Sequence, residues 1–129
     1  MRSHSFRYAA IGALGLTLAF AVSLLAQQAG MLAVSAFVVA AAIALVFEIG
    51  AAATLQRPAL SRGLCVAVIF SLDAFILYGM PGATLSVLHG DAPAWVPPLV
   101  PALLVLMFLL AVAAHILAWR FLTPRGSAQ

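Results

Sequence analysis

Long apolar runs alternate with short polar segments along the whole chain. The runs cover about residues 8–26, 31–55, 63–80 and 98–119. Each is close to the length, about 20 residues, that an α-helix needs to cross the hydrocarbon core of a bilayer. The pattern predicts an all-α integral membrane protein, in which four transmembrane helices form one domain, an antiparallel up-and-down bundle.

The breaks between these runs carry turn-forming residues. Residues 27–30 make a short uncharged turn, and Pro58 stops the second helix because proline lacks a backbone N–H. The longest connection, 81–97, contains several glycines and prolines and no basic residue. Residues 123–129 are predicted to be a disordered tail.

A cleaved signal peptide would begin in the same way as this chain, with basic residues before an apolar run. The first run is longer than the apolar part of a typical signal peptide. A cut after Ala29 would have Gln27 at a position that requires a small residue, and a cut after Ala21 would leave apolar chain behind it. We therefore expect the first span to remain.

The basic residues predict the orientation of the bundle. The chain has six arginines and no lysine, and short loops rich in basic residues stay on the cytoplasmic side. Both ends of the chain and the 56–62 loop are therefore expected in the cytoplasm, and the 27–30 and 81–97 connections outside. Each arginine lies just outside an apolar run: Arg2, Arg7, Arg57, Arg62, Arg120 and Arg125.

Amphipathic aromatic residues support these boundaries, because tryptophan and tyrosine prefer the membrane–water interface. Trp95 lies near the end of the predicted external connection, and Trp119 lies beside a basic residue at the inner end of the last span. The predicted interface anchors are Arg7, Arg57, Arg62, Trp95, Trp119 and Arg120.

The composition excludes several classes of protein. With 66% hydrophobic and 7% charged residues, the chain cannot cover an apolar core with a polar surface as a soluble domain does. The net charge of +3 comes from arginines spread in pairs, which suits anionic headgroups, at roughly 1 kcal/mol each, rather than nucleic acid. The single cysteine, Cys65, excludes an internal disulfide.

No catalytic, cofactor or metal-binding motif is recognisable in the sequence. We therefore expect no enzyme activity, no cofactor and no metal site. Richness in alanine, glycine, arginine and proline without lysine is typical of a GC-rich bacterial genome. The expected location is the bacterial inner membrane.

Three ionisable residues lie inside the predicted spans: Glu48, Asp73 and His115. Each costs about 2.5 to 3.5 kcal/mol to place in hydrocarbon and so requires a reason. Counted from the inner boundary at about 1.5 Å per residue, the three fall within about 9 Å of one another in depth. They come from three different helices and lie in the cytoplasmic half.

Helical spacing predicts the direction of the two acids. Glu48 shares its face with small residues, which let helices approach closely, so it is expected to face the bundle; these residues are Ala41, Ala44, Ala51 and Ala52. On the third span the small residues Ala67, Ser71 and Ala74 form another stripe, and Asp73 lies off it. Its side is expected to pack on the second or fourth span, or on another subunit.

Two main interpretations fit these three residues. In one, Glu48 and Asp73 are protonated or hydrogen-bonded packing residues, and His115 is solvated near the interface. In the other, the two acids bind a proton or cation that drives the movement of a substrate, with His115 as a relay, because burial favours proton exchange near neutral pH. A third possibility is that they pair with a basic residue of a partner.

The layout of four spans and short loops resembles that of small multidrug-resistance transporters. Those proteins carry their key glutamate in the first span, and this first span has no acid, so no family is assigned. The leading prediction is an accessory or oligomer-forming membrane subunit. The alternative is a small proton-coupled transporter or channel that acts as a dimer through Glu48 and Asp73. The expected partners are the lipid bilayer and further copies of the chain or a larger complex.

Overall fold

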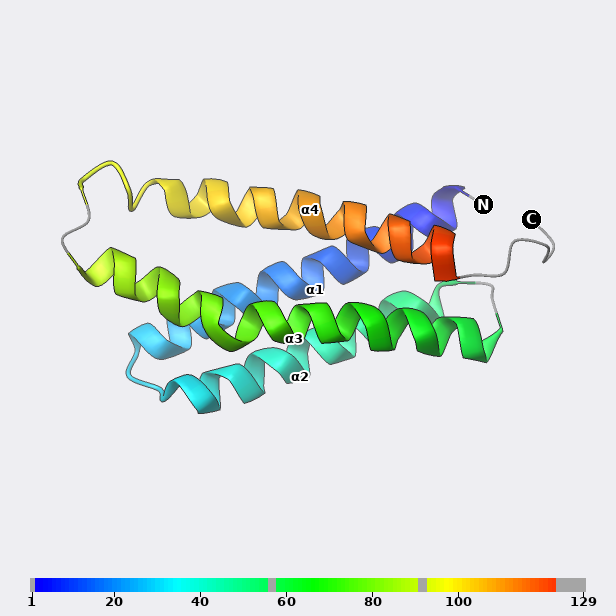
Figure 1. Ribbon diagram of the computed structural model, residues 1–129, viewed down its shortest axis with the longest axis horizontal. Coiled ribbons are helices and arrows are strands. Elements are labelled where there is room, and N and C mark those ends of the chain that lie inside the picture. Colours follow the sequence, from blue (N-terminus) through cyan, green and yellow to red (C-terminus); the bar gives the residue numbers. More distant parts are fainter. Residues whose placement is uncertain (1, 56–57, 91–92, 123–129) are drawn as a thin grey trace.

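The computed structural model describes residues 2–55, 58–90 and 93–122. Over these ranges the protein is all-α, with helices α1 (Arg2–Gln28), α2 (Ala33–Ala53), α3 (Ala59–His89) and α4 (Leu99–Leu122). Each helix is long and apolar enough to cross a membrane. The predicted four-helix membrane bundle is therefore confirmed (Figure 1).

Helix α1 is the centre of the bundle. Its backbone lies close to those of α2, α3 and α4, whereas the backbones of α2 and α4 do not approach each other within the described ranges and these two helices meet through side chains. Successive helices run in opposite directions, so that the start of α1 and the end of α4 lie at the same end of the bundle (Figure 1). Of the helix pairs whose backbones approach each other, α3 and α4 make the least extensive contact, and the candidate site lies beside this loose seam.

Small residues allow α1 and α2 to pack closely. The backbone of Gly15 lies against Phe47, and a side chain at position 15 would overlap its ring. Within a bilayer, such close approach supplies the van der Waals contact that holds helices together. The buried face of α2 consists of Ala36, Ala40, Ala44, Glu48, Ala51 and Ala52. Glu48 therefore faces the bundle, as predicted.

Helix α3 is longer at both ends than the predicted third span, 63–80. Helix α3 continues through Pro81 to His89, so residues 81–89 are helical and do not belong to the predicted 81–97 loop. Its 31 residues correspond to about 46 Å, longer than the roughly 30 Å of a hydrocarbon core. Pro81 removes one backbone hydrogen bond, but its ring is buried against the rest of the bundle and the apolar residues after it continue the helix.

The two sides of α3 differ in exposure. Asp73 lies on the buried face, and the small residues Ala67 and Ser71 are exposed. The Ser71 hydroxyl donates to the Ala67 carbonyl at 2.7 Å and so needs no partner from another helix. Exposing the Asp73 carboxyl to lipid would cost more free energy than exposing the small side chains, because lipid tolerates small side chains. The carboxyl therefore takes the buried side of the helix. The prediction that the side with Asp73 packs inside the bundle is confirmed.

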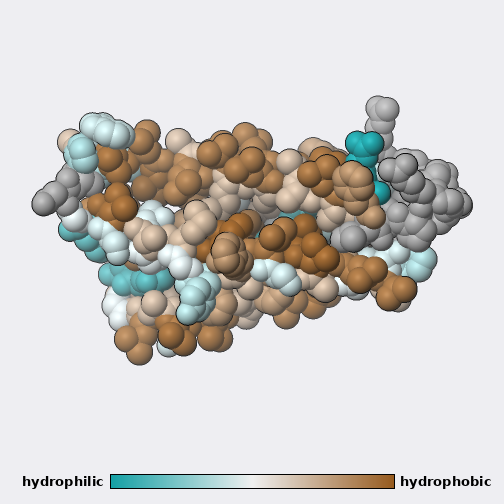
Figure 2. All heavy atoms as spheres, in the orientation of Figure 1, coloured by the Kyte–Doolittle hydropathy of each residue, from teal (hydrophilic) through white to brown (hydrophobic). Residues whose placement is uncertain are grey.

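The face of the bundle that Figure 2 shows is largely apolar, and exposed apolar side chains occur on all four helices. Side chains such as Val46, Phe75 and Leu110 are more than half exposed and would contact acyl chains. Helices with apolar outer faces of this length require a lipid bilayer as their surroundings.

The predicted anchors lie near the helix ends. Arg7 follows the first turn of α1, Arg62 lies in the first turn of α3, and Trp119 and Arg120 lie in the last turn of α4. These ends gather at one end of the bundle (Figure 1). Trp95 is 65% exposed in the α3–α4 connection. Residue 57, an arginine, lies outside the described residues, as does the tail 123–129. Which side of a membrane each end faces stays a prediction.

Candidate functional site

Each of the four helices contributes one buried polar side chain to the middle of the bundle. Tyr8 comes from α1, Glu48 from α2, Asp73 from α3 and His115 from α4. All are between 0% and 2% exposed. The sequence placed the last three at similar depth, and the structure brings them together.

His115 and Glu48 form a direct contact. The His115 Nε2 atom lies 2.9 Å from Glu48 Oε1 and 2.8 Å from Oε2. The other ring nitrogen, Nδ1, lies 2.7 Å from the Ala111 carbonyl oxygen, one turn back in α4. A carbonyl oxygen only accepts, so Nδ1 carries a proton and donates it. The interpretation of His115 as a solvated interfacial residue is therefore wrong.

That tautomer leaves one proton to be shared between Nε2 and the Glu48 carboxyl. If the proton is on Nε2, the pair is an ion pair, and if it is on the carboxyl, the pair is a neutral hydrogen bond. Both arrangements use the same heavy-atom positions. A proton can therefore be transferred between the two groups without moving either side chain.

Helix α1 shapes the space around the histidine. The His115 ring lies against the backbone of Gly12, so that a Cβ atom at that position would overlap the ring. One turn earlier, the Tyr8 ring meets the His115 ring edge to face, with centroids 5.2 Å apart. The Tyr8 hydroxyl is buried beside the Cys65 thiol and makes no hydrogen bond to an oxygen or nitrogen atom of the described residues.

Tyr8 and Gly12 are the site residues that the sequence did not identify. Tyr8 marked only the start of the first predicted span, at residue 8, and Gly12 was given no role. Gly12 is buried together with its neighbours Ala9 and Ala13. The available signal was the spacing of four between Tyr8 and Gly12, which puts them on one face of α1.

Asp73 completes the cluster, and one of its two carboxyl oxygens has no hydrogen-bond partner among the described residues. Its carboxyl lies beside that of Glu48, close enough to interact directly. Its Oδ2 atom is buried and has no hydrogen-bond partner among the described residues. Two adjacent carboxyl groups resist being ionised together, so a proton is readily held between them. Asp73 therefore links the Glu48–His115 contact to the space on its other side.

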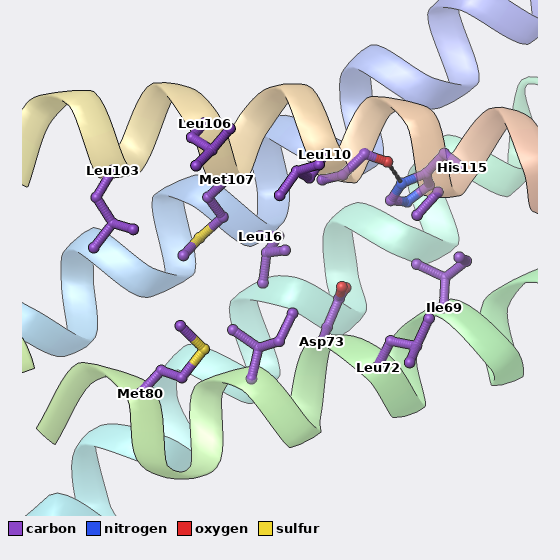
Figure 3. Close-up of a pocket in the computed structure, with 13 residues that line it drawn as sticks. Leu16, Ile69, Leu72, Asp73, Met80, Leu103, Leu106, Met107, Leu110 and His115 are labelled. Atoms are coloured by element: carbon purple, nitrogen blue, oxygen red, sulfur yellow. Dashed lines mark hydrogen bonds between the residues drawn. The ribbon is translucent and has the colours of Figure 1, made fainter. Parts of the chain in front are cut away.

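That space is a cavity of about 350 Å³ between α3 and α4. Asp73 and His115 are its polar lining residues, and the remaining described lining consists of aliphatic and methionine side chains (Figure 3). Leu72, Leu106 and Leu110 line the cavity and are also about half exposed on the outer surface. The cavity consequently opens sideways, toward the lipid.

Within the described residues, no group of three or more His, Cys, Asp or Glu side chains is placed to hold a metal ion. The site is a cluster of buried ionisable side chains beside a largely apolar cavity. No known protein family matches the sequence, and comparison with curated proteins and with solved structures finds no significant similarity. The function must therefore be argued from the geometry of the site.

Proposed function

We propose that this protein is a small proton-linked membrane carrier, which uses Glu48, Asp73 and His115 as its proton site and is not an enzyme. The observation that supports this proposal is the contact of the three groups beside the α3–α4 cavity. A solute in the cavity would touch Asp73 directly. Its binding would therefore change where the protons of the cluster reside.

The free-energy cost of burying three ionisable side chains favours a functional role for them over a role in packing alone. Three ionisable side chains are removed from water and lipid here, and apolar side chains of similar volume are often equally or more stable in such a position. A purely structural core would not need an unpartnered carboxyl oxygen beside a cavity. Coupling a solute to a proton does need one.

The test uses purified protein in liposomes that enclose a pH-sensitive dye. Outward gradients of three probes are imposed in turn: benzyltrimethylammonium as a cation, benzenesulfonate as an anion and benzyl alcohol as a neutral solute. At least one gradient is expected to drive proton movement, and the variant Asp73→Asn is expected to abolish it. Leu109→Trp, on the outer face of α4, is the control and should move protons normally. No proton movement with any probe would contradict the carrier proposal.

The second candidate function is that of an oligomer-forming subunit, and the outward face of α3 favours it. Gly63, Ala67 and Ser71 are exposed at a spacing of four, the spacing that lets two membrane helices approach closely. In a Cys65→Ala background, Ala67→Cys should form a disulfide-linked dimer in the membrane. Val105→Cys, equally outward on α4, is the control. Equal crosslinking at both positions would show random collision.

The proposed location is the bacterial inner membrane, with both ends of the chain in the cytoplasm. The arginine distribution and the lysine-free composition support it. In that membrane a proton gradient is available to drive a carrier.

A further inference from the structure

The charges around the cavity are unbalanced. Glu48 and Asp73 face a single basic side chain, His115, so the fully ionised cluster carries one net negative charge. The described arginine side chains, Arg7, Arg62 and Arg120, are not part of the cavity lining. One additional positive charge would therefore neutralise the cluster.

The unpartnered Oδ2 atom of Asp73 shows where that charge would sit. Asp73 is 2% exposed, and its carboxyl points into the space between α3 and α4 (Figure 3). A buried carboxylate oxygen without a partner costs a large part of its desolvation energy, which a cation in the cavity would recover. A proton held between the Asp73 and Glu48 carboxyl groups would fill this role when no cation is present.

The apolar lining of the cavity favours a ligand whose uncharged part is also apolar. Its remaining described lining is apolar, including the polarisable thioethers of Met80 and Met107, so a hydrated metal ion would lose its water without compensation. An organic cation with an apolar body would bury that body and keep its charge at Asp73. Such molecules concentrate in bilayers with anionic headgroups and would enter sideways between α3 and α4.

We propose that the α3–α4 cavity binds amphipathic organic monocations, with the Asp73 carboxylate as the counter-ion. This inference rests on the proposed proton-linked carrier and names its substrate class. The cation takes the place of a proton held by the cluster. Each cation that binds therefore releases one proton from the cluster.

The exchange makes binding depend on pH. The groups that face Asp73 are Glu48 from α2, Tyr8 from α1 and His115 from α4, with Cys65 beside Tyr8 on α3 itself. Because one proton leaves when one cation binds, affinity should rise with pH by up to about tenfold per unit. A ligand that binds without displacing a proton would show no such slope.

The experiment measures binding to the full chain in nanodiscs by equilibrium dialysis, with empty nanodiscs subtracted. The probes are benzyltrimethylammonium and its neutral isostere neopentylbenzene, which differ by a nitrogen in place of a carbon. The cation is expected to bind in excess of empty nanodiscs and the isostere at least about tenfold more weakly. Equal binding of the two probes would overturn the inference.

Two pairs of variants locate the binding. Asp73→Asn should weaken cation binding by about tenfold or more, while Asp73→Glu keeps the charge and should retain most of it. Leu110→Trp fills the cavity and should block binding, whereas Leu109→Trp lies outside it and should not. Unchanged binding in Asp73→Asn, or equal binding in the two tryptophan variants, would place the ligand elsewhere and overturn the inference.

The liposome measurement separates the two proposals. Proton movement driven only by benzenesulfonate or benzyl alcohol would support the proposal of a proton-linked carrier and contradict the proposal that its substrate is an organic cation. Cation binding at Asp73 without proton movement under any gradient would support the proposed cation site and contradict the proposal that the protein is a carrier.

Discussion

At the scale of single residues, the absence of a side chain at position 12 is as important as the polar groups. Gly12 leaves the room that the His115 ring occupies. We predict that Gly12→Ala displaces the ring and lowers the free energy of unfolding by about 1 to 3 kcal/mol, the usual cost of overpacking. Thermal unfolding in detergent, followed by circular dichroism, measures this.

Gly50→Ala is the matched control, because nothing lies within 4 Å of a Cβ atom at that position in α2. Alanine there should leave stability unchanged or raise it by up to about 1 kcal/mol through helix propensity. If both variants unfold at the same temperature, the close approach of α1 to His115 does not hold.

The Glu48–His115 contact gives a second prediction at this scale. Glu48→Leu removes the hydrogen-bond partner of the buried His115 Nε2 atom, so it should destabilise the protein by about 3 to 5 kcal/mol. Glu48→Gln can still donate to Nε2 and should cost much less. Adding His115→Phe to Glu48→Leu should recover part of the loss, as for any coupled pair. Strictly additive losses in the double variant would argue against the contact.

The sequence predicted part of this site for a definite physical reason. Charged groups in hydrocarbon are costly, so Glu48, Asp73 and His115 stand out, and the fixed rise of a helix places them at similar depth. Depth does not determine which helices are neighbours. The role of Tyr8 and the gap at Gly12 depend on α1 crossing both α2 and α4, which only the packed structure shows.

At the scale of elements, α3 is where the sequence pattern and the structure differ most. Pro81 and Gly82 indicated a loop, but a proline in a long helix loses only one hydrogen bond and its buried ring packs against the bundle. The stripe of small residues indicated a packed face, yet lipid accepts small residues too. The pattern of small and large residues could not show which side of α3 is packed and which faces lipid. The free-energy cost of exposing Asp73 to lipid does indicate the packed side.

The face assignment of α3 can be tested with single cysteines in a Cys65→Ala background. Ile69→Cys and Leu77→Cys lie on the buried side and should resist a lipid-phase thiol reagent. Phe75→Cys, whose native side chain is 82% exposed, is the control and should react rapidly. Rapid reaction at positions 69 and 77 in the native membrane would show that this face is open to lipid.

At the scale of the whole molecule, the bundle is asymmetric. Helix α1 touches every other helix, whereas α3 and α4 meet loosely and leave the cavity between them. The tight part of the fold holds Glu48 and His115 in place, and the loose seam gives Asp73 access to the lipid side. The proposed exchange of a solute at this site requires both properties.

The orientation of this bundle is the final prediction. The ends that carry Arg7, Arg62 and Arg120 gather at one end, and short basic segments stay in the cytoplasm. Reporter fusions at Pro58 and Gln129 should therefore read cytoplasmic, and fusions after Gln28 and near Gly90 should read external. The control replaces the arginines at the cytoplasmic end of one helix with glutamine. This change should weaken the preference of that end for the cytoplasm without removing a transmembrane span. An external reading at Gln129 in the unmodified protein would contradict a four-span bundle with both ends inside.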